Sequence, residues 1–381
     1  MKVERFLPSE EAEALLGLTR EIADGELAPR ASDFEARGEF PREVLRTLGQ
    51  AGLLGLPYPE EHGGGGQPYE VYLQVLEELA YRWLTMAEAV SVHGLACYPV
   101  AAFGSDEQRK RFLPEFLGGE LLGAYCLSEP QGGSDAASLA AKAVKDGDEY
   151  VVDGVKAWIT HAGVADFYNI FCRTGVPGPK GISCLVADAD NPGIQPQRRE
   201  RTMGLTGSPV AQIVFDGARV PADRLVGGEG IGFTIAMSAL DSGRLGIAAC
   251  AVGLSQAALD YAVSYAKDRD QFGQPIIGFQ GVGFMLADMA TKVSAARATT
   301  LAAARLRDAG RPYSMQAAQA KLFATDTAMQ VATDAVQILG GYGYVADHPV
   351  ERWMREAKLL QIVEGTNQIQ RMVISRNLAR G

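Results

Sequence analysis

The chain is short of the residues that build metal sites and disulfide frameworks. Its 381 residues include five cysteines, an odd number, and no two of them have C-x-x-C spacing. The four histidines are scattered, with neither H-x-x-x-H nor H-E-x-x-H spacing. We therefore expect no metal site and no disulfide framework, and we place the protein in a reducing cytoplasm.

Positive charge is also scarce. Lysine and arginine number 36 against 46 acidic residues, which gives a formal net charge of -10 at pH 7. Non-specific binding to nucleic acid needs clustered basic side chains that replace counterions. We therefore expect no nucleic-acid partner, although a few local donors are enough to bind a phosphorylated small molecule.

Long hydrophobic runs and a leader pattern are missing as well. The longest apolar stretch, near residues 231–240, falls far short of the roughly 20 residues that span a bilayer. The N-terminus carries acidic residues early and has no apolar core of the kind found in signal peptides. We therefore expect neither a membrane-spanning segment nor a signal peptide.

Three segments of different character follow one another along the chain. Residues 1–118 have helical periodicity, residues 119–230 have short β-branched runs, and residues 231–381 return to long helices. The expected fold is α+β, with an N-terminal helical domain, a middle antiparallel β-domain and a C-terminal four-helix bundle.

Helical signals fill the first segment. A helix should follow Ser9, and a second should begin near Pro41, because proline suits the first turn of a helix. Apolar periodicity continues over residues 69–103, where we expect a break at Gly94 and Pro99.

Turn signals define the middle segment. Two Asp-Gly pairs, Asp146-Gly147 and Asp153-Gly154, are typical of tight hairpins between antiparallel strands. In the last segment the expected helices cover residues 233–267, 281–309, 314–339, 348–362 and 366–379.

The stretch from Tyr125 to Asp135 lies where helices give way to strands. Gly132 and Gly133 allow successive N–H groups to form an anion nest, and Ser128 and Ser134 add hydroxyl donors. This predicts a cradle for a phosphorylated or heterocyclic cofactor. An ordinary turn into the first strand explains the same residues, and taken alone it is the stronger interpretation.

Two further segments have a similar ambiguity. Trp158, followed by Thr160, offers a flat indole to a flat cofactor, but a tryptophan in a strand is more often part of the core. Arg269 and Phe272 lie in a polar loop between long helices. Arg269 could meet phosphate, or form a weak surface pair with Asp270.

An acid and a base share one face of a long helix. Asp241 and Arg244 have i, i+3 spacing, so an intrahelical ion pair is expected. The alternative is an arginine that is presented to an anionic ligand.

Glu364 is the most informative residue. It should end one helix, with Gly365 as the terminator and Thr366 or Asn367 as the cap of the next. The neighbouring Val363 and the preceding isoleucine are apolar, and a carboxylate in apolar surroundings becomes a better base because its pKa rises. A general base and a solvent-facing turn acid are equally good interpretations of this position.

Taken together, and in this order, these segments resemble the acyl-CoA dehydrogenase family of flavoproteins. The resemblance covers essentially the whole chain. Its carriers are Y-C-L-S-E-P-Q-G-G-S-D, K-A-W-I-T, R-D-Q-F-G-Q-P-I, Q-I-L-G-G-Y-G-Y and I-V-E-G-T-N-Q-I-Q-R. Each motif is weak alone, whereas five in register are specific.

The resemblance implies a homotetramer that holds FAD between its middle and C-terminal domains. It also implies an acyl-CoA substrate and electron-transfer flavoprotein as the electron acceptor. The residues that match cofactor positions are Tyr125, Cys126, Leu127, Ser128, Gly133, Ser134, Trp158, Ile159, Thr160, Arg269, Gln271, Phe272, Gln280, Gln337, Ile338, Gly340, Gly341, Thr366, Asn367 and Gln368. The residues that match substrate positions are Ser134, Asp241, Arg244, Val363 and Gly365.

By the same resemblance, Glu364 takes the position of the catalytic base. The implied reaction is anti α,β-dehydrogenation of the thioester, with the α-proton going to Glu364 and the β-hydrogen to flavin N5. The Glu364 backbone N–H and a flavin hydroxyl would stabilise the enolate-like oxygen. Arg269, Phe272 and Gln280 would reach the FAD of a neighbouring subunit.

Two departures from the family pattern concern the substrate. Val363 replaces the tyrosine that commonly precedes the base, and His161 replaces a common asparagine. The first predicts a wider acyl pocket. An oxidase-like flavoprotein that uses oxygen remains an alternative, as does a scaffold that keeps the fold without catalysis.

Overall fold

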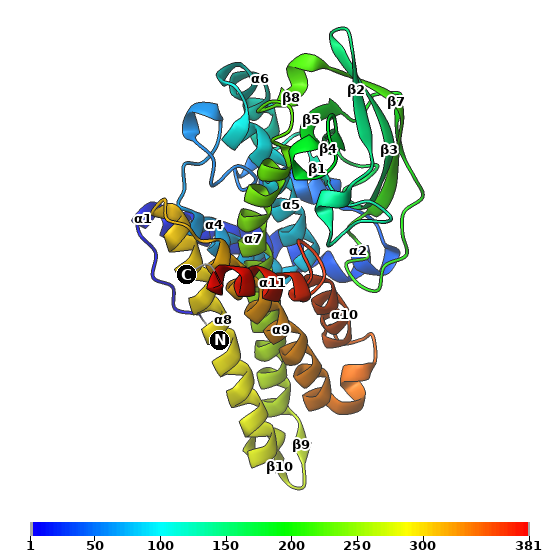
Figure 1. Ribbon diagram of the computed structural model, residues 1–381. Helices are drawn as coiled ribbons and strands as arrows, with labels where there is room; N and C mark the ends of the chain where they lie inside the picture. The colour runs from blue at the N-terminus through cyan, green and yellow to red at the C-terminus, as the bar shows by residue number, and fades with distance from the viewer. Residues whose placement is uncertain (1–2, 380–381) are drawn as a thin grey trace.

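A computed structural model describes residues 3–379 of the chain. A helical part comes first, a β-sheet follows, and long helices close the chain (Figure 1). The helical and β parts lie together at one end, and the C-terminal helices extend away from them. This order is the one that the sequence predicts.

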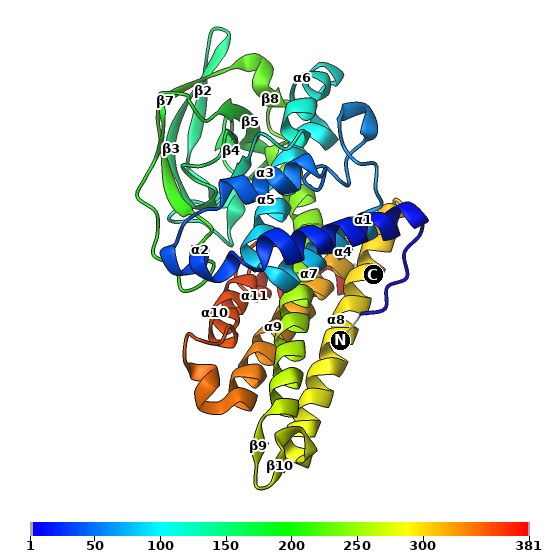
Figure 2. The ribbon, with the colours of Figure 1, turned by 180° about the vertical axis from the view of Figure 1, so that it is seen from behind.

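The first helix begins where the sequence predicts it, because Ser9 Oγ accepts a hydrogen bond from the Ala12 N–H at 3.1 Å. It packs against α4 on the face seen in Figure 2. The α-helices of this part are α1 (Glu10–Ile22), α2 (Ala31–Arg37), α3 (Arg42–Gln50), α4 (Tyr69–Arg82), α5 (Leu84–Phe103) and α6 (Asp106–Leu117).

The predicted break at Gly94 and Pro99 is wrong, since both residues lie inside α5. The chain breaks instead at Trp83, whose backbone is extended with φ -156° and ψ 106°. The indole is buried, and its Nε1–H donates to Glu35 Oε1 at 2.8 Å. Burial and hydrogen bonding of one large side chain therefore decide where the helix ends.

Two helices are apolar enough to cross a membrane by length and composition, which the count of uninterrupted apolar residues missed. They are α5 and α7 (Gly232–Asp268), and 78% and 83% of their apolar windows are buried inside the protein. A helix that is buried by its own protein is expected to be hydrophobic on all sides. Burial therefore accounts for their composition.

One sheet occupies the middle of the chain. Its strand order is β6-β7-β3-β2-β4-β5-β8, and β1 pairs with β4. The strands are β1 (Gly123–Cys126), β2 (Lys142–Asp146), β3 (Glu149–Thr160), β4 (Phe167–Arg173), β5 (Ile182–Asp188), β6 (Ile194–Pro196), β7 (Val210–Pro221) and β8 (Leu225–Val226).

The sheet corrects two expectations. It is not wholly antiparallel, because β1 and β2 both pair with β4 in parallel. Only the first Asp-Gly pair makes a hairpin, between β2 and β3. Gly154 lies within β3 at φ 143°, where a Cβ would come 2.6 Å from the Cβ of Ala141. Glycine there permits a close approach and a register shift rather than a turn.

The C-terminal helices follow the predicted ranges within two residues at each end. Three of them are long, and alanines such as Ala248 and Ala324 are buried between them, which allows close packing of the backbones. The elements are α7, the short hairpin strands β9 (Asp270–Gln271) and β10 (Gln274–Pro275), α8 (Gln280–Asp308), α9 (Ser314–Leu339), α10 (Val350–Leu360) and α11 (Asn367–Leu378).

Candidate active site

Glu364 lies in the tight turn that joins α10 to α11. The first of these helices ends at Leu360, so Glu364 lies beyond the helix end at which the sequence placed it. Its φ is 52° and that of Gly365 is 89°, and such left-handed backbone is uncommon for a residue with a side chain. Thr366 caps α11 as predicted, because its Oγ1 accepts the Ile369 N–H at 3.3 Å.

Both carboxylate oxygens of Glu364 are buried, and neither has a hydrogen-bond partner within residues 3–379. Burial raises the pKa of this carboxyl, Lys321 and Arg244 lower it and Glu88 raises it, and together they bring it to about 8. The group is therefore a stronger base than an ordinary glutamate and is desolvated when ionised.

The side chain of Glu364 points at the backbone of α7. A Cβ built on Gly243 would lie 2.0 Å from Glu364 Oε2. Any other residue at position 243 would displace the carboxylate, so the glycine makes the space in which the acid lies.

The ion pair that the sequence predicts on α7 forms between Asp241 and Arg244. Arg244 Nη1 lies 2.5 Å from Asp241 Oδ1, and Ser314 Oγ donates to the same oxygen at 3.0 Å. Arg244 is buried, and its Nε has no partner within the described residues. One charged face of α7 therefore lies directly beside the carboxylate of Glu364.

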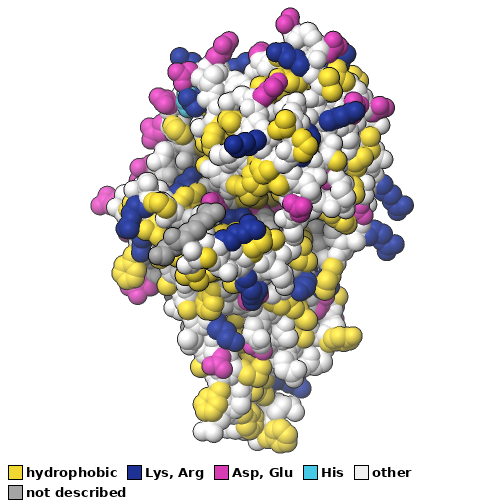
Figure 3. Space-filling model, in the orientation of Figure 1, with side chains coloured by type: hydrophobic (Ala, Val, Ile, Leu, Met, Phe, Trp, Pro, Cys, Tyr) yellow, Lys and Arg dark blue, Asp and Glu magenta, His cyan; other side chains and the backbone are white. Residues whose placement is uncertain are grey.

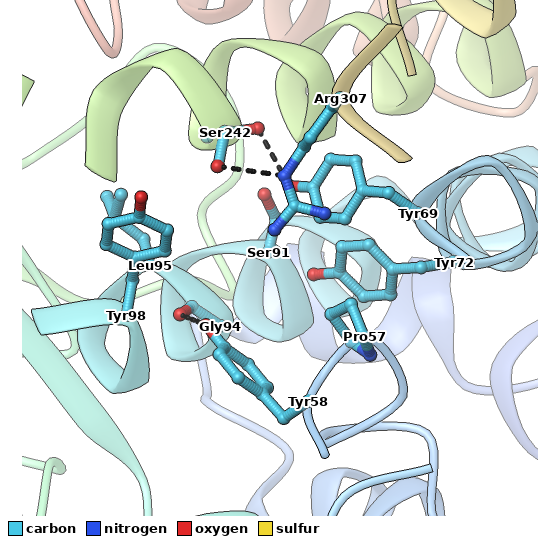
Figure 4. A pocket seen from close by; sticks show the side chains of 11 residues that line it. Pro57, Tyr58, Tyr69, Tyr72, Ser91, Gly94, Leu95, Tyr98, Ser242 and Arg307 are labelled. Atoms are coloured by element: carbon cyan, nitrogen blue, oxygen red, sulfur yellow. Dashed lines mark hydrogen bonds between the residues drawn. The ribbon is translucent and has the colours of Figure 1, made fainter. Parts of the chain in front are cut away.

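A small pocket opens on the same part of α7 (Figure 4). The cavity volume is about 10 Å³, which is room for about one water molecule. The Arg307 guanidinium lies 3.7 Å from the centre of the Tyr69 ring. The lining residues are Pro57, Tyr58, Tyr69, Tyr72, Ser91, Gly94, Leu95, Tyr98, Ser242, Gly243 and Arg307, and Val363 is not among them.

The tyrosine hydroxyls of this pocket already have partners in the protein. Tyr58 donates to the Gly94 carbonyl at 2.5 Å, and Tyr69 donates to the Ser242 carbonyl at 2.8 Å. Tyr98 shares a 2.6 Å hydrogen bond with a serine of α7. The pocket therefore offers aromatic rings more than free donors.

A bulge in β3 turns Trp158 out of the sheet. The pairing of β3 with β7 shifts register between Lys156 and Ile159, and Trp158 has φ 60°. Its side chain is 63% exposed, so it is not part of the core. The Ala157 N–H donates to the Ser128 carbonyl at 2.9 Å, which brings the two predicted cofactor segments together.

Glu88 of α5 links these segments to the base. The Thr160 hydroxyl donates to one carboxylate oxygen of Glu88 at 3.3 Å, and the Ser208 hydroxyl donates to the other at 3.1 Å. Burial raises the pKa of Glu88 to about 7. Because its charge acts on Glu364 as well, residues of all three parts of the chain meet here.

Part of the predicted anion nest is not available. The Gly132 N–H donates to the Glu129 carbonyl at 3.0 Å. The Glu129 side chain is structural, because it accepts the Lys156 ammonium at 2.7 Å and two backbone N–H groups. Gly133 and Ser134 remain exposed, so they are the donors that a ligand can still reach.

Other predicted cofactor residues lie far from Glu364 in the same chain. The β9–β10 hairpin projects from the end of the long helices opposite the sheet (Figure 1). Phe272 at its tip is 94% exposed, and hydrophobic side chains gather there (Figure 3). The Arg269 guanidinium lies 5.6 Å from the centre of the Tyr342 ring. Exposed residues at this end include Gln271, Gln280, Gln337, Gly340 and Gly341.

Several predicted cofactor residues face the core instead of a ligand. Their side chains are almost fully buried, so only their backbone could contact a bound molecule. They are Cys126, Leu127, Ile159, Ile338 and Asn367. The hydroxyl of the half-buried Tyr125 donates to the Ala236 carbonyl at 3.3 Å, and Gln368 is exposed.

Sequence reasoning missed Glu88, Gly243, Lys321 and the tyrosine-lined pocket. For Glu88 and Lys321 a signal was present, because each is a lone charged residue inside an apolar helical run. Gly243 carried no such signal, since its role depends on the residue that lies opposite.

Comparison with known proteins agrees with this arrangement. Models of the N-terminal, middle and C-terminal domains of acyl-CoA dehydrogenase match residues 9–120, 124–218 and 230–379. An acyl-CoA dehydrogenase of Bacillus subtilis (strain 168) is 44% identical over 366 residues, which cover 96% of this chain and 97% of the relative.

Two solved structures are similar over nearly their whole length. The butyryl-CoA dehydrogenase of Megasphaera elsdenii has a TM-score of 0.96 at 38% identity, covering 99% of this chain and 100% of that one. A structure described as the electron transferring flavoprotein of Acidaminococcus fermentans, in work on electron bifurcation, has a TM-score of 0.97 at 42% identity, with the same coverage.

The fold and these matches define an oxidoreductase of the flavoprotein class, with FAD as its cofactor. The chain belongs to the acyl-CoA dehydrogenase family.

The residues present fit FAD. Trp158 offers an exposed aromatic face on a strained bulge, and the hydroxyls of Ser128 and Thr160 lie on adjoining segments. Backbone strain and bulges concentrate where a protein must aim a side chain at a ligand. The exposed hairpin around Phe272 is too far from this site to serve it within one chain.

The raised pKa of Glu364 predicts a pH-dependent stability. A carboxyl whose folded pKa is about 8 binds a proton more tightly in the folded state, so stability falls as pH rises from its ordinary pKa of 4.5 to about 8. Glu364→Gln should remove this loss. We expect its melting temperature to exceed that of the wild type by about 2 °C or more at pH 8.5, and to match it near pH 5.

Differential scanning calorimetry of the flavin-loaded proteins from pH 5 to pH 9 measures this difference. Parallel pH profiles for the two proteins would contradict the buried, ionisable state of Glu364.

Proposed function

We propose that this protein dehydrogenates a short acyl-CoA thioester between Cα and Cβ, giving the trans-2-enoyl-CoA, with Glu364 as the general base. The observation that carries the proposal is the buried carboxylate of Glu364, which has no hydrogen-bond partner and lies against Gly243. A base without a partner is free to take a proton from a substrate.

Proton removal is the task of the protein itself. The α-hydrogen of a thioester is weakly acidic, and a carboxylate whose pKa is raised to about 8 is better matched to it than an ordinary glutamate. Glu364 receives the α-proton, and the Cα–H electron pair forms the new double bond as the β-hydrogen departs. FAD, when bound, supplies the acceptor for the β-hydrogen and its two electrons. The backbone N–H of Glu364 stabilises the charge on the thioester oxygen.

The binding residues divide into two groups. Ser128, Trp158 and Thr160 hold the cofactor beside Glu364, and Asp241 with Arg244 borders the CoA chain. The exposed hairpin carrying Arg269 and Phe272 serves the cofactor of a neighbouring subunit in a homotetramer. Its distance from the site in its own chain supports this assignment.

The proposal of a short acyl group rests on a structural relative. The similarity to a structure of a butyryl-CoA dehydrogenase favours the same class.

Electron-transfer flavoprotein is the proposed oxidant, as the family resemblance implies, and a similar structure comes from work on such a flavoprotein. The oxidase-like alternative predicts a different product. Hydrogen peroxide formed in air during turnover with butyryl-CoA would support the oxidase and count against this partner.

The first prediction of this function concerns the base. Glu364→Gln should retain FAD and acyl-CoA binding, because amide and carboxylate are nearly isosteric. Reduction of the flavin by substrate should slow by about three orders of magnitude. Anaerobic stopped-flow bleaching of the flavin by butyryl-CoA measures the rate.

Glu356→Gln is the matched control. Glu356 is also buried, with its pKa raised to about 8, but it lies in α10 beside Arg352. This variant should bleach at nearly the wild-type rate. Fast bleaching in Glu364→Gln would place the base elsewhere.

The second prediction concerns assembly. Arg269→Ala should weaken retention of FAD and the tetramer together, because a ligand that binds only the assembled state stabilises it by mass action. Sedimentation at several FAD concentrations, with flavin content measured from absorbance, follows both. Arg219→Ala, another exposed arginine, should change neither. A fully flavin-loaded tetramer of Arg269→Ala at low FAD would contradict the assignment.

The third prediction concerns Val363, the residue before the base. By the family resemblance Val363 faces the acyl group near Cα and Cβ, so Val363→Tyr should fill space there and shift preference from branched to unbranched short chains. A methylene is worth about 1–3 kcal/mol in such a pocket, so the shift should be graded. Values of kcat/KM for isobutyryl-, butyryl- and palmitoyl-CoA in both proteins test this. A wild type that prefers palmitoyl-CoA, or an unchanged ranking in the variant, would show the idea to be wrong.

A further inference from the structure

A buried lysine lies beneath the turn that carries Glu364. Lys321 of α9 has no exposed surface. Its ammonium donates to the Gly365 carbonyl at 3.1 Å and to Asn367 Oδ1 at 2.9 Å. One cation therefore ties together the residue after Glu364 and the first residue of α11.

Burying a lysine for these two hydrogen bonds alone is costly. Both acceptors are neutral, and an ammonium loses much more hydration than a neutral donor does on entering a protein. Burial lowers the pKa of Lys321 to about 7, and Glu364 is the first group that raises it again. The position of Lys321 is therefore best explained by a charge that it opposes.

The charged groups that face Glu364 and Lys321 come from every neighbouring element. Glu88 lies on α5, Arg244 on α7 and Asp326 on α9. Arg244 pairs with the carboxylate of its own helix. Asp326 accepts hydrogen bonds from Asn367 and Gln361, both at 2.7 Å, and pairs with an arginine of α11 at 3.2 Å.

These pairings leave Lys321 without a bonded carboxylate of its own within the described residues. Glu364 likewise lacks a hydrogen-bonded partner there. Glu88 is satisfied by two hydroxyls. Lys321 and Glu364 are therefore the two buried ionisable groups whose charges are left to balance each other across the turn.

We propose that Lys321 is a positioning residue for the reaction, whose ammonium holds the Glu364 turn in its left-handed conformation and favours the ionised form of the Glu364 carboxyl over the protonated form. The proposal rests on the proposed role of Glu364. Lys321 does not touch the substrate. It acts through the backbone of the turn and through its charge.

The sign of the effect follows from the charge. Without a cation nearby, the ionised form of Glu364 is less stable and its pKa rises further. Activity that needs ionised Glu364 is lost as pH falls through that pKa, so the acidic limb of the pH profile must move to higher pH.

Two variants separate charge from hydrogen bonding. Lys321→Gln keeps a donor for the Gly365 carbonyl but loses the charge, whereas Lys321→Arg keeps the charge. The acidic limb of kcat/KM for butyryl-CoA should shift upward by about one pH unit in Lys321→Gln, so activity near pH 7 should fall about tenfold. In Lys321→Arg the limb should stay close to that of the wild type.

Lys156→Gln is the burial-matched control. Lys156 is equally buried and bonds the Leu127 carbonyl at 3.0 Å and Glu129 at 2.7 Å, away from the Glu364 turn. Its loss should lower thermal stability without moving the acidic limb. Melting temperature and flavin content, measured for every variant, show which proteins are folded.

An acidic limb at the wild-type pH in folded Lys321→Gln would overturn the proposal. If that variant does not fold, Lys321→Arg decides the question. This variant keeps the charge, so an acidic limb that moves by one pH unit in the folded protein would contradict the electrostatic role. Failure of the proposed function is a separate outcome, since it is detected by fast flavin bleaching in Glu364→Gln whatever Lys321 does.

Discussion

The rest of the site depends on one contact. A buried carboxylate lies against helix backbone at a position that has no side chain. Glu364 reaches α7 only because position 243 has no side chain. Its burial is unfavourable unless surrounding charges and backbone stay in place. The contact therefore ties the α10–α11 turn to the central helix of the molecule and fixes the distance between them.

Close packing of small residues holds this contact in a fixed geometry. Alanines of α7 and α9 are fully buried against one another, and α7 also packs against α4 and α5. Backbones that approach this closely have little freedom to slide, because interiors are packed at crystal-like density. Glu88 and Lys321, on the two neighbouring helices, are thereby held at constant positions around the acid.

The sequence predicted what depends on local pattern. Helical periodicity located the C-terminal helices, and Ser9 and Thr366 marked helix starts. The motifs pointed to Glu364 as the base, which stays a prediction. Prediction failed where a distant contact overrides a local preference. Trp83 ends a helix because its indole bonds Glu35, while Pro99, the stronger local breaker, remains inside one. Gly243 and Lys321 could not be assigned because their partners lie about 120 and 40 residues away in the chain.

The tyrosine hydroxyls of the pocket are already hydrogen-bonded within the protein, and this affects which molecules the pocket can hold. Tyr58 and Tyr69 donate their hydroxyl hydrogens to main-chain carbonyls, so they present aromatic rings to a bound molecule. A guest that carries a hydroxyl would lose water on entering, and these two tyrosines would offer it no free donor in return. These two rings therefore favour an apolar guest over one that carries a hydroxyl beside them.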